Sequence, residues 1–360
     1  MDASEFAARR QRLAAALAAR RTEAMLVSAA PNVRYLSGFT GDNAALLLLP
    51  GKALLFTDPR YAIQARQQVS CRVRICRGSL IEGVSAALRK LGAARIGYEP
   101  ARITCAAFAT LQSRLPMRAS LDPLPGLVEE LRMIKSAAEL ALIRRSVELN
   151  SRAFELAVKR VRPGMTERDL AAEIEYRMRR LGAEKPSFDT IVAGGRRSAL
   201  PHAEPTAARL TNGDLVVVDM GSFCDGYASD MTRMLFLGTP GARVRRVYRA
   251  VLEAQQAGID AVRSGVSAAR VDAAARRVLR GYGLERAFVH STGHGLGLEI
   301  HEPPRLGKRD QTLLQPGMAV TIEPGVYLEN FGGIRIEDTV EVTAAGCKVL
   351  TPTPKDLRVI

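Results

Sequence analysis

The stretch over residues 215–233, LVVVDMGSFCDGYASDMTR, decides the fold of this chain. Its apolar run over 215–218 is too short for a helix and rich in β-branched residues, which predicts a buried strand ending at Asp219. Two glycines then predict a hairpin, and a second strand over 227–236 brings Asp230 back towards Asp219. Two acids on adjacent strands repel each other unless a cation or a shared proton lies between them. The stretch therefore indicates either a metal site or a solvated hairpin with two surface acids.

The histidines of the chain favour the metal site. Only four occur in 360 residues, and they are His202, His290, His294 and His301. Three of them fall within HSTGHGLGLEIH, where glycines separate them. A single histidine is more often a core or surface residue than a ligand. The glycines on both sides of His294, however, leave room for a close approach to the backbone.

Two more acids have the same character as the first pair. Glu323 ends an apolar strand in MAVTIEPG, and Glu337 lies in the strand-like GGIRIEDTV, with Arg335 two residues earlier on the same face. One imidazole and four carboxylates exceed the needs of one divalent ion, but they suit two ions with bridging acids. The predicted ligands are Asp219, Asp230, His294, Glu323 and Glu337.

The five predicted ligands occur in a recognisable order, Asp, Asp, His, Glu, Glu, in DMGSFCDGYASD, STGHG, TIEPG and GIRIED. This order resembles the pita-bread metallopeptidases, which comprise methionine aminopeptidase, Xaa-Pro aminopeptidase and prolidase, with creatinase as a metal-free relative. The surrounding PSFDTIVAGG, LPHAEP, GLEIHEPP and LQPGMAVTIEPGVY are most similar to the prolidase and Xaa-Pro aminopeptidase branch. The resemblance covers nearly the whole chain, including NVRYLSGF and TDPRYAIQA. Creatinase itself is disfavoured, because this chain keeps every acid that would bind metal.

The resemblance implies a dinuclear centre with two divalent metal ions per chain. Asp230 and Glu337 would bridge the ions. Asp219 would bind one ion, and His294 with Glu323 would bind the other. Carboxylate-rich sites favour manganese here, with cobalt and zinc as alternatives. Two such ions lower the pKa of a bridging water and polarise the peptide carbonyl.

The resemblance also implies which residues handle the substrate. Glu323 would receive the proton of the water. The other three histidines would surround the substrate carbonyl and the proline, because imidazole exchanges protons near neutral pH; they are His202, His290 and His301. Arg335 and Tyr327 would fix the orientation of Asp219. The alternative for Arg335 is a plain cross-strand partner.

The substrate pocket is the least constrained part of the sequence prediction. Phe188 and Tyr227 are candidate walls for the proline ring, and either could equally belong to the core. Arg305 follows His301 by four residues in HEPPR, where similar prolidases carry an arginine. A guanidinium suits bidentate binding of the substrate carboxylate, and the alternative is an exposed loop arginine.

The chain is long enough for two domains, each with its own core. Residues 1–126 alternate between strands and helices, which predicts an α/β domain with a covered sheet. The turn-rich DPLPG over 122–126 predicts a linker. Residues 127–360 predict an α+β catalytic domain, and the resemblance implies the pita-bread fold with a curved, mostly antiparallel sheet. Its expected helices cover 136–160, a segment capped by Thr166, 242–264 and 267–282.

Charge and cysteine usage limit the partners. Residues 1–126 hold 18 basic and 8 acidic residues, a net +10 of the +15 that the whole chain carries. A basic domain can bind nucleic acid, but these arginines are spread over helices with few aromatics between them, so we expect no nucleic-acid partner. Some of the charge could attract anionic peptide termini. The five cysteines form no CxxC pair and no apolar stretch reaches about 18 residues, so we expect a cytoplasmic protein with free thiols and no membrane contact.

The sequence therefore predicts metal-dependent hydrolysis of the Xaa-Pro peptide bond, above all in dipeptides, as in prolidase. An Xaa-Pro aminopeptidase acting on longer peptides is the first alternative. A methionine aminopeptidase is disfavoured by the amino-terminal domain and by PHAEP and EIHEPP. A non-enzymatic binding protein of the same fold is disfavoured by the intact ligand set. Because similar prolidases are homodimers, we expect a two-fold homodimer that acts on small proline-containing peptides.

Overall fold

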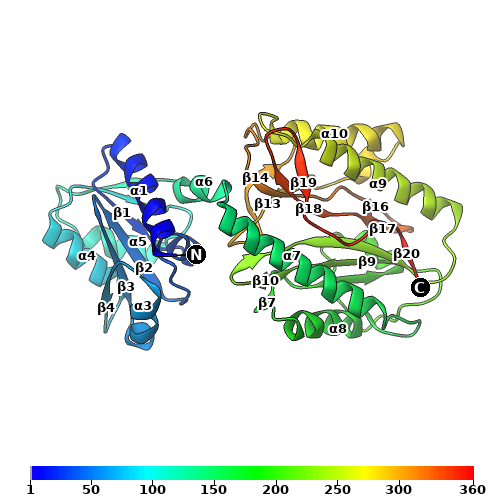
Figure 1. The fold of residues 1–360 in the computed structure, drawn as a ribbon, viewed down its shortest axis with the longest axis horizontal. Coiled ribbons are helices and arrows are strands. Elements are labelled where there is room, and N and C mark those ends of the chain that lie inside the picture. The colour runs from blue at the N-terminus through cyan, green and yellow to red at the C-terminus, as the bar shows by residue number, and fades with distance from the viewer. Residues whose placement is uncertain (1) are drawn as a thin grey trace. The chain divides into compact units, whose positions relative to one another are not determined.

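The computed structural model describes residues 2–360, and the chain divides into two compact units. The first unit ends at Arg132, and the second covers Met133–Ile360. Figure 1 shows one sheet packed against helices in the first unit, and several sheets between two pairs of helices in the second. Among the described residues, no helix combines the length and the apolar composition that crossing a bilayer requires.

The first unit is built on one six-stranded mixed sheet with the order β4-β3-β2-β1-β5-β6. The β1–β2 and β2–β3 pairs are antiparallel, and the other neighbours are parallel. The strands are β1 (Ala24–Val27), β2 (Ala44–Leu49), β3 (Lys52–Thr57), β4 (Arg72–Ile75), β5 (Arg95–Tyr98) and β6 (Ser120–Pro123). The helices are α1 (Ala3–Ala19), α2 (Ala30–Ser37), η1 (Pro59–Tyr61), α3 (Ala62–Gln68), α4 (Leu80–Leu91), α5 (Cys105–Arg114) and α6 (Leu127–Met133).

Helix α2 escapes sequence prediction because a distant residue caps it. Its N-cap residue, Ala29, offers no capping side chain. The Glu99 carboxylate, just after β5, accepts instead from the backbone N–H groups of Ser28 at 2.6 Å and Ala29 at 3.0 Å. It also accepts from Asn32 Nδ2 at 2.6 Å. A cap supplied from another strand leaves no local signal at the start of the helix.

The predicted linker over 122–126 is largely structured. Its first two residues belong to β6, which pairs with β5 at the edge of the sheet, where Pro123 needs no ladder donor. Helix α6 then returns to the first unit, because the buried Arg132 donates from Nη1 to Asn32 Oδ1 at 2.6 Å. The first unit therefore ends at Arg132, beyond the predicted boundary after residue 126.

The second unit places its strands between two layers of helices, α7 with α8 and α9 with α10 (Figure 1). Thr166 caps α8, as predicted. The helices are α7 (Ala137–Val158), α8 (Glu167–Arg180), η2 (Gly195–Ala199), α9 (Ala242–Ala261), α10 (Ala268–Gly281) and η3 (Glu285–Ala287). The strands in the first half are β7 (Lys185–Pro186), β8 (Ile191–Gly194), β9 (Leu215–Met220), β10 (Ser222–Cys224), β11 (Tyr227–Ala228) and β12 (Met231–Phe236).

The remaining strands complete a set of small sheets. They are β13 (Gly293–Gly295), β14 (Glu302–Leu306), β15 (Ala319–Ile322), β16 (Gly325–Leu328), β17 (Gly332–Arg335), β18 (Asp338–Val342), β19 (Cys347–Val349) and β20 (Arg358–Val359). The two larger sheets have the orders β20-β12-β9-β8 and β14-β13-β15-β18-β19. Nearly all their pairs are antiparallel, and the exception is β12 with β20. The predicted α/β unit followed by a mostly antiparallel α+β unit is confirmed.

Strand β9 shows why the deciding stretch reads as an unbroken apolar run. Val216 and Val218 pack among residues of α7 and α8. Leu215 and Val217 point the other way and pack among residues of α9 and α10. A strand covered on both faces needs apolar residues at every position, not at alternate ones. Asp219 interrupts this run with a buried carboxylate.

We expect the buried ion pair between Lys135 and Glu302 to stabilise the second unit. Lys135 Nζ donates to Glu302 Oε2 at 3.3 Å, and both side chains are buried. Lys135→Met leaves the carboxylate without this ammonium, so the free energy of unfolding in urea should fall by about 3–5 kcal/mol. The double variant Lys135→Met/Glu302→Gln should recover part of the loss. Exposed Lys159 provides the control, since Lys159→Met should change stability by less than about 0.5 kcal/mol. Unchanged stability of Lys135→Met would contradict this prediction.

Candidate metal centre

The hairpin that carries the first two acids is held in place through its backbone. Strands β9 and β12 pair with Thr232 opposite Asp219. Helix α7 fixes the bend, because Asn150 Nδ2 donates to the Met220 carbonyl at 3.0 Å and Ser146 Oγ donates to the Ser222 carbonyl at 2.8 Å. Both acids of the hairpin are buried.

Two of the predicted ligands lie where the chain leaves one sheet for another. The expected strand over 227–236 is split, since β11 pairs with β10 and β12 pairs with β9. Asp230 lies directly before β12. GGIRIEDTV is split in the same way between β17 and β18, and Glu337 lies directly before β18. At both breaks the backbone stops pairing with one strand before it pairs with the next, so the carboxylate there can turn towards the cavity.

His294 lies in β13 between two glycines, and the close packing around this strand requires both of them. A Cβ on Gly293 would lie 1.9 Å from the Thr321 carbonyl oxygen, and one on Gly295 would lie 2.3 Å from the Pro303 carbonyl oxygen. The neighbouring backbones therefore approach β13 more closely than any side chain would allow. The glycines that separate the histidines serve this packing.

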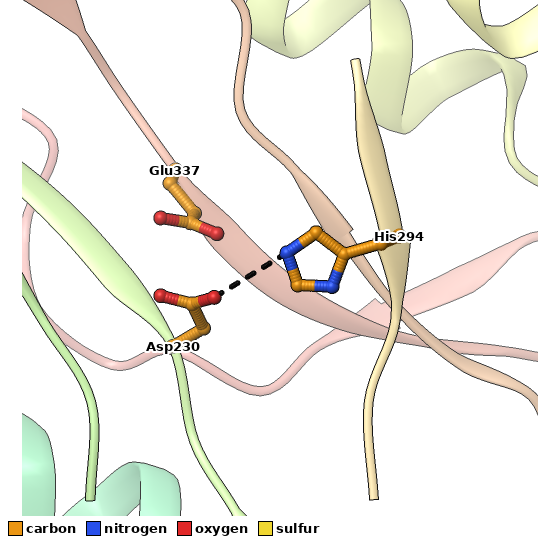
Figure 2. A group of neighbouring side chains, drawn as sticks. All are labelled: Asp230, His294 and Glu337. Atoms are coloured by element: carbon orange, nitrogen blue, oxygen red, sulfur yellow. Dashed lines mark ion pairs between the residues drawn. The ribbon is translucent and has the colours of Figure 1, made fainter. Parts of the chain in front are cut away.

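Asp230, His294 and Glu337 form the centre of the site, as Figure 2 shows. Each offers one ligand atom, and these atoms all lie within 4.8 Å of one another. His294 Nε2 lies 3.5 Å from Asp230 Oδ2 and 3.4 Å from Glu323 Oε1. Asp219 lines the same cavity. The structure therefore brings all five predicted ligands to one place.

The carboxylates of this centre carry more negative charge than the neighbouring cation offsets. Burial, followed by repulsion from Asp219 and Glu323, raises the pKa of Asp230 well above its ordinary value. Burial, followed by repulsion from Asp230 and Glu323, does the same to the pKa of Glu337. Among the described residues, Asp219 Oδ1 and Glu337 Oε1 are buried without a hydrogen-bond partner. Carboxylate oxygens and an imidazole nitrogen are ligands of divalent ions, so the residues fit the metal centre that the sequence predicts.

Arg335 connects the acids on one side of the centre. Its Nη2 donates to Asp219 Oδ2 and its Nη1 donates to Tyr327 Oη, both at 2.6 Å. Tyr327 Oη lies 2.9 Å from His290 Nε2. The predicted chain from Tyr327 through Arg335 to Asp219 is present, and it reaches His290 as well.

Sequence reasoning missed Thr232. Its Oγ1 donates to Glu337 Oε2 at 2.8 Å and accepts from Arg335 Nε at 3.1 Å. This hydroxyl links the arginine to the second buried acid. The sequence showed only that Thr232 lies in the expected strand over 227–236, and its burial directly opposite Asp219 emerges from the fold.

The three remaining histidines all line the cavity, which has a volume of about 890 Å³. His202 and His301 are exposed to it, and His290 is half-buried. The ring of His301 meets the ring of His294 edge to face, with centroids 4.4 Å apart. Burial lowers the pKa of both His290 and His301, which favours their neutral forms.

The three substrate-pocket candidates lie in different places in the structure. Phe188 is half-buried and lines the cavity, and Arg305 is exposed at its edge. Tyr227 does not line it. Its side chain is buried beneath α7, where Oη donates to Glu139 Oε1 at 3.0 Å. The sequence left Tyr227 open between the pocket wall and the core, and in the structure its side chain belongs to the core.

Two stretches of the chain match known families. Residues 141–344 match Metallopeptidase family M24, and residues 9–134 match the Creatinase/Prolidase N-terminal domain. The M24 match includes every residue of the site described above, and the second match covers most of the first unit.

The chain is also similar to solved and curated peptidases over nearly its whole length. The structure of an Xaa-Pro dipeptidase from Bacillus anthracis is 36% identical, with a TM-score of 0.95 and coverage of 99% of this chain and 100% of that one. That of an X-Pro aminopeptidase from Thermotoga maritima is 36% identical, with a TM-score of 0.89 and coverage of 94% and 98%. The Xaa-Pro dipeptidase of Pyrococcus horikoshii is 35% identical over 93% of this chain and 94% of its own.

These matches confirm the resemblance carried by the order of the five ligands. The α/β first unit and the α+β second unit have the organisation of the pita-bread metallopeptidases. The acids around His294 fit divalent ions, and the protein is a metal-dependent peptidase. The chain belongs to metallopeptidase family M24.

Proposed function

We propose that this peptidase is an Xaa-Pro dipeptidase, which hydrolyses the bond before proline in dipeptides. Relatives named Xaa-Pro dipeptidase support the proposal. The observation that carries it is the position of Arg305, which lines the same cavity as the metal ligands and follows His301 on β14. A permanently charged guanidinium there suits the carboxylate that ends a dipeptide.

The metal centre of the proposal holds two divalent ions, with manganese as the favoured ion and cobalt and zinc as alternatives. Four carboxylates and one imidazole support two ions, and oxygen-rich sets of this kind suit manganese. Asp230 and Glu337 would hold both ions, Asp219 one of them, and His294 with Glu323 the other. Divalent ions bound there would lower the pKa of water and polarise the substrate carbonyl.

The side chains around the centre supply binding and proton transfer. Glu323 Oε1 accepts from Thr321 Oγ1 at 3.2 Å, which fixes a half-buried carboxylate that would take the proton of the attacking water. His202 and His301, exposed to the cavity, would donate hydrogen bonds to the substrate carbonyl and protonate the leaving nitrogen. His290, fixed through Tyr327, would complete the ring. Phe188 would pack against the proline ring.

Loss of a bridging acid should remove the metals and the activity together. Asp230→Ala deletes a ligand placed between both ions, so we expect metal content measured by mass spectrometry, and turnover of Ala-Pro, to fall to background. Asp225→Asn is the matched control, since this exposed acid of the same hairpin lies at a left-handed φ of 50°, which asparagine tolerates. The control should keep two ions per chain. Full activity of Asp230→Ala, or of the parent after exhaustive chelation, would contradict a dinuclear centre.

Arg305 should decide between dipeptides and longer peptides. Its charge-assisted pair with the dipeptide carboxylate is worth roughly 1.5–3 kcal/mol, so Arg305→Ala should lower kcat/KM for Ala-Pro by about one to two powers of ten. The loss for Ala-Pro-Ala should be small, because its carboxylate lies one residue further out. Arg305→Lys should recover only part, since an ammonium lacks the bidentate fork. Exposed Arg152 on α7 provides a control variant, Arg152→Ala. A parent that prefers Ala-Pro-Ala would be an Xaa-Pro aminopeptidase instead.

We further propose a homodimer of two-fold symmetry and a cytoplasmic location, with no nucleic-acid partner. The five cysteines are all free, which agrees with a reducing compartment. Two-fold dimers are the commonest closed assemblies. Light scattering at micromolar protein should give about twice the 39.0 kDa mass of the chain. A mass equal to one chain at that concentration would refute the dimer.

A further inference from the structure

A second cavity of about 820 Å³ adjoins the metal cavity. The two share part of their walls, because four residues line both: His290, Ser291, Arg305 and Asp310. Arg305 Nε donates to Ser291 Oγ at 3.3 Å, so these two side chains form a partition between the cavities. A group that passes Arg305 on leaving the metal cavity therefore enters the second one.

Part of the charge around the second cavity is already paired. Five basic and two acidic side chains line it. Arg276 is engaged by Asp272 at 2.7 Å and by the Phe288 carbonyl at 3.0 Å. Glu285 is engaged by Arg280 through two bonds of 2.6 and 2.8 Å. These pairs contribute little net attraction for a ligand.

Most of the remaining charge is positive, and Asp310 supplies one carboxylate against it. Arg286, Lys308 and Arg309 are exposed, and within residues 2–360 none of them makes a hydrogen bond or an ion pair through its side chain. The remaining acid, Asp310, accepts from the backbone N–H of Arg305 at 3.0 Å and of Thr312 at 2.8 Å. A concave wall with a net positive charge raises the local concentration of anions.

We propose that this basic pocket, the cavity lined by Arg286, Arg305, Lys308 and Arg309, is a subsite for the residue after proline and selects a carboxylate there. The ligand class is Xaa-Pro peptides with Asp or Glu in third position. The proposal rests on the proposed cleavage before proline, which places the proline carbonyl beside Arg305. One further residue extends the chain by about 3.5 Å, past the partition and towards Lys308 and Arg309.

The test compares peptides that differ in one charge. Turnover is measured on Ala-Pro, Ala-Pro-Glu, Ala-Pro-Gln and Ala-Pro-Lys, and calorimetry measures binding of the product-like Pro-Glu and Pro-Gln to the metal-loaded protein. The variants are Lys308→Ala/Arg309→Ala and Lys308→Glu, with Arg152→Ala on α7 as the control for loss of an exposed cation. Inorganic phosphate at matched ionic strength serves as the competing free anion.

The parent should prefer Ala-Pro-Glu over Ala-Pro-Gln by about fivefold in kcat/KM, and Pro-Glu should bind more tightly than Pro-Gln by a similar factor, as expected for two exposed charge pairs. Added salt should shrink both ratios. Lys308→Ala/Arg309→Ala should abolish them and cleave Ala-Pro within twofold of the parent. Lys308→Glu should lower the preference for Ala-Pro-Glu and raise kcat/KM for Ala-Pro-Lys relative to the parent.

The two proposals fail in different ways. Equal binding of Pro-Glu and Pro-Gln, or a preference that survives in Lys308→Ala/Arg309→Ala, would overturn the subsite even if Ala-Pro is cleaved. Competition by phosphate without any discrimination between the peptides would also overturn it, because the pocket would then hold only free anions. Selective binding of Pro-Glu without cleavage of any Xaa-Pro peptide would support the anion subsite and overturn the proposed function.

Discussion

Repulsion among carboxylates in one cavity is the constraint on which the catalytic unit depends. Asp219, Asp230 and Glu337 are buried, and burial together with the neighbouring carboxylates raises the pKa of Asp230 and of Glu337. Arg335 relieves one of them directly, and Thr232 gives another a hydrogen-bond donor. Neither contact reaches Asp230. The protein thus neutralises only part of the negative charge that it buries. Divalent cations bound from solution would balance the rest. The same electrostatic balance therefore determines both how tightly the cavity binds metal and how far the fold tolerates several buried acids.

The parts of this arrangement that sequence could predict are those with a local cause. The strand over 216–218 could be predicted because both faces of β9 are covered, so that every position is apolar. The start of α8 could be predicted because the hydroxyl of Thr166 caps it. The five predicted ligands, which line one cavity, could be proposed because their residue types and order are informative by themselves. Tyr227 stayed open between pocket and core because the face that it presents depends on α7, which lies far away in sequence. Thr232 was missed because its role exists only when Arg335 and Glu337 meet it.

The first unit illustrates the same limit in a different form. Glu99 caps a helix that begins about seventy residues earlier, and Arg132 closes the unit by bonding to Asn32 of that helix. Burial, with a smaller contribution from the charge of Glu129, raises the pKa of Glu99, while the donors of Ser28, Ala29 and Asn32 favour its charged form. Side chains far apart in sequence thus replace the local signals that mark a helix start or a domain end. The compact unit therefore extends past the turn residues from which the boundary was expected.

The way in which α7 holds the metal hairpin has a consequence for how the hairpin can diverge. Asn150 and Ser146 bond to the carbonyl groups of Met220 and Ser222, which every residue type would present. Other contacts from α7 depend on residue identity, because Ser146 Oγ also lies 3.3 Å from Ser222 Oγ, and Glu139 accepts from the Tyr227 hydroxyl at 3.0 Å. The bend therefore constrains its positions unequally: a substitution of Ser222 or Tyr227 removes a bond to α7, whereas the carbonyl contact at Met220 survives an exchange of its side chain.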